Sequence, residues 1–211
     1  MTDELVFYTN PMSRGRIARW MLEEVGQPYR TVILDYGTTM KGADYLAVNP
    51  MGKVPAITHR GETITECAAI CAYLADAFPE ARLAPPPAER ARYYRWLFFA
   101  AGPVEQAVTH KALDVRVAPD RERMVGYGTM DCVLRALEGA LEGRDYIAAD
   151  RFTAADVYLG SQLGWGMMFG TIEKRPVFEA YVARIQDRPA YRRAEQIDVA
   201  ATPAPEPATA S

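Results

Sequence analysis

The sequence has few of the residues on which many catalytic and metal sites depend. Its 211 residues include three cysteines and two histidines. Cys67, Cys71 and Cys132 form no Cys-x-x-Cys pair, and His59 and His110 stand far apart in the chain. A zinc site, a disulfide framework, a histidine-based catalytic pair and thioredoxin-type disulfide exchange are therefore unsupported, and we expect no metal. The cysteines are typical of small buried side chains in a reducing cytosol.

Long hydrophobic runs and an excess of one charge are also absent. No apolar stretch is long enough to span a membrane, and the first residues lack the basic and apolar regions of a signal peptide. The 24 basic and 27 acidic residues nearly balance, which gives no reason to expect a nucleic-acid partner. With 49% hydrophobic residues, the composition is that of a globular protein. We therefore expect a cytoplasmic protein with neither a membrane nor a nucleic-acid partner.

Strand and helix patterns alternate over the first eighty residues. A β-rich run over 5–9 passes through Asn10-Pro11 into a helical pattern that begins at Ser13, a residue suited to capping a helix. The patterns that follow predict a strand over 29–34, a short helix over 43–48, a hairpin centred on Gly61 and a helix over 68–78. This order favours a βαβ unit with a parallel strand pair, followed by a ββα unit.

A proline-rich segment over 83–88 divides the sequence, and we interpret it as a stiff linker between a domain at 1–82 and one at 89–199. Strand signals fade after it. One helical pattern covers 90–108, with a kink expected at Gly102-Pro103. Another helix is expected to begin at a capping box formed by Thr153 and Asp156. Further helical patterns cover 121–141, 175–186 and 189–193. Residues 200–211 have no core-forming side chains and are expected to be a disordered tail.

Three motifs, in this order, resemble the soluble glutathione transferases. The first is Pro-Met-Ser-x-x-x-x-x-Arg, which begins at Pro11 and is similar to serine-type bacterial members. The second is Asn-Pro-Met-Gly-Lys-Val-Pro, which begins at Asn49. The third is Thr-Glu-Cys-Ala-Ala-Ile-Cys-Ala-Tyr-Leu, which begins at Thr65. The capping box also matches this family. The resemblance covers about residues 4–195. It implies an α/β thioredoxin-like N-terminal domain, an all-α C-terminal helical domain, and a homodimer built from both.

The resemblance also implies a site for glutathione, a tripeptide with two carboxylates, one ammonium and one thiol. Val54, which precedes a proline that is cis in the family (Pro55), would pair its backbone groups with the cysteinyl portion like an added strand. Glu66 would take the ammonium. Lys53 and Lys41 are candidates for the glycyl carboxylate. A solvated surface lysine explains Lys53 equally well and explains Lys41 better.

Cys67 departs from the family pattern. The resemblance implies that its backbone N–H, at a helix N-terminus, takes the γ-glutamyl carboxylate. The family usually has a hydroxyl residue at this position, and a thiol is a weaker hydrogen-bond donor. A second interpretation of Cys67 is a redox-active thiol at a helix N-terminus.

Ser13 is the predicted donor to the reacting sulfur. A thiol has a pKa near 8.5, and lowering it by about two units requires roughly 2.7 kcal/mol of preference for the thiolate. A helix N-terminus contributes about 0.3–2 kcal/mol and one charge-assisted hydrogen bond about 1.5–3 kcal/mol, so the two together suffice. Tyr8 is the alternative, because other members of the family use a tyrosine near the end of the first strand.

The predicted function is transfer of glutathione to small hydrophobic electrophiles, as in detoxification. An apolar wall between the domains would hold the electrophile. Its candidate residues are Tyr94, Phe98, Trp165, Met168 and Phe169. Each of these side chains is also typical of core packing. Two alternatives remain open. One is a non-catalytic interaction or stress-response protein of the same fold, which Cys67 favours, and the other is a dehalogenase or isomerase specialisation.

Overall fold

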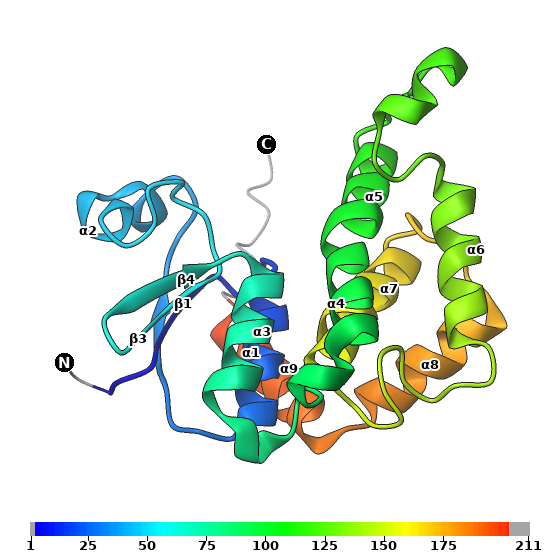
Figure 1. The fold of residues 1–211 in the computed structure, drawn as a ribbon. Helices are drawn as coiled ribbons and strands as arrows, with labels where there is room; N and C mark the ends of the chain where they lie inside the picture. The colour runs from blue at the N-terminus through cyan, green and yellow to red at the C-terminus, as the bar shows by residue number, and fades with distance from the viewer. Residues whose placement is uncertain (1–2, 203–211) are drawn as a thin grey trace.

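A four-stranded mixed sheet forms the first part of the chain in the computed structural model, which describes residues 3–202 (Figure 1). Its strands are β1 (Val6–Thr9), β2 (Arg30–Ile33), β3 (Ala56–His59) and β4 (Glu62–Thr65), in the order β2-β1-β3-β4. β1 and β2 are parallel, whereas β1 with β3 and β3 with β4 are antiparallel. The predicted βαβ and ββα units are therefore confirmed.

The two faces of the sheet carry different helices because side chains alternate along each strand. Phe7 and Ile57 point into the main core with α1 (Gly15–Val25) and α3 (Cys67–Ala77). Tyr8 belongs to a smaller cluster on the other face. That cluster contains Leu34, Met40, Tyr45 and Ala56 and is covered by the 3₁₀ turn η1 (Thr39–Lys41) and α2 (Ala43–Leu46).

The second part of the chain is helical. Short 3₁₀ turns at η2 (Pro79–Ala81) and η3 (Pro87–Glu89) lead into α4 (Arg90–Phe99), the π-helical turn η4 (Ala100–Val104) and α5 (Glu105–Ala112). They are followed by η5 (Pro119–Met124), α6 (Met130–Leu141), α7 (Ala154–Met168), α8 (Pro176–Gln186) and α9 (Pro189–Ala201). The capping box at Thr153 and Asp156 is present and begins α7, which is buried along most of its length. No helix in the described part of the chain is both long and apolar enough to cross a membrane.

The structure corrects several predicted boundaries. The single helix predicted over 121–141 is wrong, because η5 and α6 are separated by a turn that includes Gly128 at φ +66°. The expected kink at Pro103 takes the form of the π-helical turn η4. α9 continues to Ala201 rather than ending at 193, so the predicted tail does not begin at 200, and residues 203–211 lie outside the described residues.

α9 returns to the first domain and packs along α1 (Figure 1). Its buried positions are Ala190, Ala194 and Asp198, so small side chains allow close approach and one carboxylate enters the interface. Asp198 Oδ1 accepts a hydrogen bond from Arg19 Nε at 2.7 Å, and both side chains are almost fully buried. Glu24 and Glu23 on α1 form further ion pairs with Arg188 and Arg193. The last helix therefore fixes the helix that begins at the candidate site.

Candidate functional site

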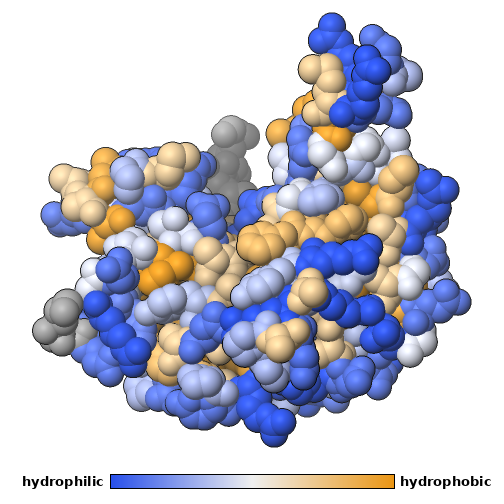
Figure 2. All heavy atoms as spheres, viewed as in Figure 1, coloured by the Kyte–Doolittle hydropathy of each residue, from blue (hydrophilic) through white to orange (hydrophobic). Residues whose placement is uncertain are grey.

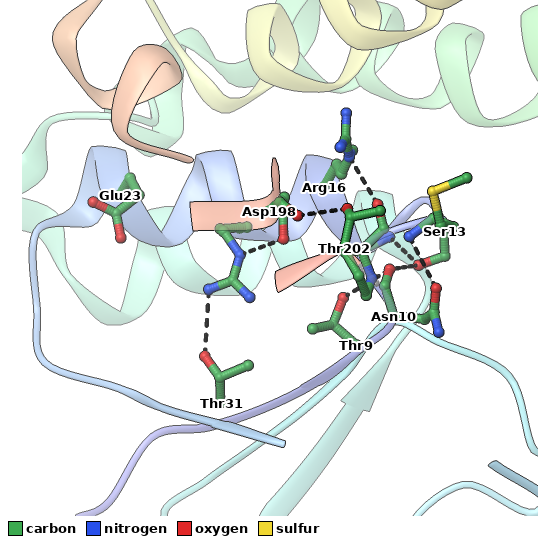
Figure 3. Close-up of polar contacts among 12 residues, drawn as sticks. Thr9, Asn10, Ser13, Arg16, Glu23, Thr31, Asp198 and Thr202 are labelled. Atoms are coloured by element: carbon green, nitrogen blue, oxygen red, sulfur yellow. Dashed lines mark hydrogen bonds and ion pairs between the residues drawn. The ribbon is translucent and has the colours of Figure 1, made fainter. Parts of the chain in front are cut away.

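The turn between β1 and α1 is built around Asn10 (Figure 3). The Asn10 side chain is buried, its amide nitrogen donates to the Leu34 carbonyl at 2.8 Å, and its Oδ1 accepts from the Met12 N–H at 2.9 Å. The Asn10 carbonyl accepts from both the N–H and the hydroxyl of Ser13, at 3.1 and 2.6 Å. Asn10 thus fixes the turn that places Ser13.

Ser13 lies half-buried immediately before the helix. Its hydroxyl oxygen accepts the Gly15 N–H at 2.9 Å, so Ser13 makes a capping contact although α1 itself begins at Gly15 with Arg14 in the cap position. A Cβ on Gly15 would lie 1.9 Å from the hydroxyl oxygen of Thr9, which explains why the close approach of helix and strand requires glycine. The Ser13 proton can turn from Asn10 to a bound anion, because the Asn10 carbonyl keeps its hydrogen bond from the Ser13 N–H.

Ser13 opens onto a cavity of about 560 Å³ between the two parts of the chain. The first part contributes Pro11, Met12, Ser13, Arg14, Arg16, Tyr36, Met40, Lys53 and Val54, and the helical part contributes Val108, Ala112, Gln162, Trp165, Gly166, Met168, Phe169 and Thr171. Figure 2 shows the molecule hollowed between the lobe that carries α2 and the protrusion above α5 and α6. The first wall carries the positively charged side chains Arg14, Arg16 and Lys53, and the opposite wall is mainly apolar.

The cavity brings together only part of the set predicted from the sequence. Ser13, Lys53 and Val54 line it on one side, and Trp165, Met168 and Phe169 line it on the other. Tyr8 does not line it, because its ring faces the smaller cluster and packs on Tyr45 with ring centroids 5.5 Å apart.

Tyr94 and Phe98 also lie outside this cavity. Both are exposed on α4, with ring centroids 6.3 Å apart, so the prediction that they form its wall is not met. Helical spacing predicted that the two side chains share a face of α4 but left open which surface that face meets.

The loop before β3 presents the backbone of Val54. The Val54-Pro55 peptide bond is cis, as the resemblance implies. The Lys53 carbonyl is fixed by hydrogen bonds from Tyr45 Oη at 2.5 Å and from the Asn49 amide at 2.8 Å. Lys41 has a structural role here, because its ammonium donates to the Gly52 carbonyl at 2.7 Å and it does not line the cavity.

Glu66 and Cys67 lie at the start of α3. Glu66 is exposed and has φ +65°, a conformation that is uncommon for a residue with a side chain and is concentrated at functional positions. Cys67 is buried, and its thiol donates to the Arg14 carbonyl at 3.5 Å. Burial, reinforced by the charge of Glu105, raises the pKa of the Cys67 thiol to about 12. A thiol that stays protonated at neutral pH does not support the redox interpretation.

Sequence reasoning missed the polar contacts that join the two walls. Arg14 forms an ion pair with Glu105 at the start of α5, and Glu105 accepts a hydrogen bond from Gln162 on α7. Nothing in the sequence links these three residues, because they come from distant segments. Asn10 had a local signal, since Asn-Pro is a typical turn. Among the described residues, no group of three or more histidine, cysteine or acidic side chains is placed to hold a metal ion.

The fold and the site together define a class of protein. A thioredoxin-like domain presents the N-terminus of α1 to a cavity, and an all-helical domain forms the opposite wall. Residues 12–77 match the family described as "Glutathione S-transferase, N-terminal domain", and residues 118–189 match "Glutathione S-transferase, C-terminal domain".

Comparison with individual proteins agrees with these matches. The chain is 31% identical over 174 residues to glutathione S-transferase GstA of Escherichia coli O157:H7, covering 80% of this chain and 86% of the relative. The structure of a glutathione transferase from Methylococcus capsulatus has a TM-score of 0.76 at 33% identity and covers 93% of this chain and 99% of its own. A sphingomonad glutathione S-transferase complexed with glutathione has a TM-score of 0.75 at 32% identity, with 92% and 98% covered. The chain belongs to the glutathione transferase family.

Proposed function

We propose that this protein joins the sulfur of glutathione to a small, largely apolar electrophile. The thiol of bound glutathione loses its proton to solvent, and the thiolate attacks an electrophilic carbon. A sulfur–carbon bond forms, and a leaving group departs with the bonding electrons. With an activated alkene, the carbanion that forms takes a proton from water instead. The observation that carries this proposal is the Ser13 hydroxyl, at the N-terminus of α1 and on the wall of the cavity.

Ser13 acts as a hydrogen-bond donor to the thiolate. Its oxygen already accepts the Gly15 N–H, which polarises the hydroxyl and makes it a stronger donor. The helix N-terminus adds about 0.3–2 kcal/mol in favour of the anion and the charge-assisted hydrogen bond about 1.5–3 kcal/mol. Tyr8 is not assigned this role, because its ring packs on Tyr45 and it is not among the residues that line the cavity.

The remaining groups of glutathione are met by the loops beside Ser13. The backbone of Val54, before cis Pro55, pairs with the cysteinyl portion, and Lys53 meets the glycyl carboxylate. Exposed Glu66 takes the ammonium, and the Cys67 N–H at the start of α3 takes the γ-glutamyl carboxylate. The Cys67 side chain supports the turn through Arg14 rather than binding the ligand.

The electrophile binds against the apolar wall formed by Trp165, Met168 and Phe169, of which the last two are largely exposed in the single chain. In this proposal residues 1–82 are the glutathione-binding domain, 83–88 the linker and 89–199 the domain that selects the electrophile. We take the setting to be cytoplasmic detoxification.

The exposed pair Tyr94 and Phe98 on α4 suits a homodimer. Large apolar side chains that are adjacent and exposed on a single chain are typical of an association surface. Their place outside the cavity is consistent with burial by a second copy rather than by substrate.

Isothermal titration calorimetry with glutathione, followed by a conjugation assay with a chlorodinitrobenzene, tests the proposal. We expect saturable binding and release of chloride, with conjugation strongly reduced in Ser13→Ala. Absence of glutathione binding would show that the proposal is wrong. Binding without conjugation of any electrophile would support the non-catalytic alternative.

A further inference from the structure

We propose that Arg16 forms an anion subsite on the electrophile side of the cavity, and that the preferred substrates are apolar electrophiles that carry a carboxylate. This inference rests on the proposed function and specifies its second substrate. It assigns to Arg16 a role in substrate selection that is separate from activation of the thiol by Ser13.

Arg16 is placed where the two walls of the cavity meet. It is half-buried on the first turn of α1 and lines the cavity together with Ser13 from its own domain and with Gln162 and Trp165 from α7. Its Nε donates to the Pro11 carbonyl at 2.8 Å, which fixes the plane of the guanidinium (Figure 3). Hydrogen bonding through Nε leaves the two terminal nitrogens to meet a ligand.

The other positively charged side chains on the cavity wall, Arg14 and Lys53, are engaged elsewhere. Arg14 is paired with Glu105, so its charge is largely balanced by a protein carboxylate. Lys53 lies next to Val54, on the side assigned to glutathione. Arg16 forms no ion pair with any carboxylate in residues 3–202, and no aspartate or glutamate is among the residues that line the cavity. The positive charge of Arg16 is therefore presented to the ligand.

The environment behind Arg16 does not cancel this charge. Arg16, Asp198 and Glu195 border a small cavity of about 30 Å³, which is large enough for a water molecule. Asp198 is engaged by Arg19 through Oδ1, while its Oδ2 has no hydrogen-bond partner among the described residues. Asp198 therefore has its ion pair with Arg19 and not with Arg16, and Glu195 is exposed to solvent on α9.

A carboxylate is the anion that fits this geometry. The planar guanidinium can donate two parallel hydrogen bonds to a carboxylate, which a lysine cannot do. The neighbouring Trp165, Met168 and Phe169 supply an apolar wall for the body of the substrate. A neutral apolar electrophile would use the same wall but gain nothing from Arg16.

The test compares two substrates that differ only in charge, a chlorodinitrobenzoate and the corresponding chlorodinitrobenzamide, under saturating glutathione. We expect Arg16→Gln to lower kcat/KM for the benzoate by about tenfold or more, the effect of losing one charge-assisted hydrogen bond, and to change the benzamide value by less than about twofold. Arg16→Lys should retain part of the preference. Arg193→Gln, which removes an exposed arginine of the α1–α9 interface, should change neither value.

An equal loss with both substrates would overturn the inference, because it would mean that Arg16 serves the Pro11 turn or the thiolate. The inference would also be overturned if the ratio of kcat/KM for the benzoate to kcat/KM for the benzamide were the same in Arg16→Gln as in wild type. Calorimetry with glutathione separates the two proposals. Wild-type protein that binds glutathione and conjugates the benzamide, yet shows no charge preference dependent on Arg16, refutes the subsite alone. Failure to bind glutathione refutes the proposed function.

Discussion

Arg19 on α1 and Asp198 on α9 form an ion pair of 2.7 Å between side chains that are 2% and 1% exposed. Arg19 also donates to the hydroxyls of Tyr29 and Thr31, at 3.1 and 3.3 Å, and its guanidinium lies over the ring of Phe7. One buried arginine therefore joins the sheet, the first helix and the last helix. The orientation of α1, and with it the Ser13 turn, depends on a residue near the far end of the chain.

Removing the charge of Asp198 should be costly. Asp198→Asn leaves the buried Arg19 without its counter-charge, and breaking such a pair costs about 3–5 kcal/mol of unfolding free energy. The control is Arg193→Gln, which breaks the pair between exposed Arg193 and partly buried Glu23 and should cost about 1 kcal/mol. Urea unfolding of both variants measures the difference. Similar losses in the two variants would contradict a structural role for the buried pair.

Ser13→Ala should raise the pKa of the thiol of bound glutathione by about 1–2 units, which corresponds to the loss of one charge-assisted hydrogen bond. Tyr8→Phe should leave that pKa unchanged, because the Tyr8 ring packs against Tyr45 and does not line the cavity. The ultraviolet absorbance of the thiolate, followed against pH, reports both values. An increase in Tyr8→Phe but not in Ser13→Ala would reverse the assignment.

The three cysteines should differ sharply in reactivity. Burial raises the pKa of the Cys67 thiol to about 12 and that of Cys71 well above its usual range. Cys132 is exposed, and its hydrogen bonds with Thr129 and Arg135 lower its pKa. We expect native protein to react quickly with one equivalent of a disulfide reagent at pH 8 and Cys132→Ser to react slowly. Rapid labelling of that variant would contradict the burial of Cys67 and Cys71.

Folding stability should fall below neutral pH through His59. Its ring is buried between Tyr73 and Phe78, and burial, with the charge of Arg60, lowers its pKa below the usual 6.5. The unfolded chain therefore takes up a proton at a higher pH than the folded protein does, so stability decreases as the pH falls through about 6.5. Unfolding free energies of wild type and His59→Gln between pH 7 and 5 test this. A loss as steep in the variant as in wild type would assign the effect to other groups.

Features defined by neighbouring residues could be predicted from the sequence. The capping box at Thr153 and Asp156 is one, because both partners lie within a single helical turn and the Asp156 carboxylate accepts from the Thr153 N–H at 2.9 Å. The hairpin centred on Gly61 is another, formed by β3 and β4. The helix predicted over 121–141 failed because local helix-forming residues on both sides outweighed the glycines at 126 and 128, where the chain turns.

The sequence by itself determined the order of elements and the βαβ and ββα units, and its motifs named Ser13 and Val54 as candidate site residues, since periodicity, turn residues and short motifs are local properties. Only the tertiary structure decided which faces meet. It packed Tyr8 on Tyr45 outside the cavity lining, left Tyr94 and Phe98 outside the cavity, and paired Arg19 with Asp198, 179 residues away. Side-chain periodicity specifies that a helix or strand has two faces, but burial and charge pairing between distant segments determine what each face contacts.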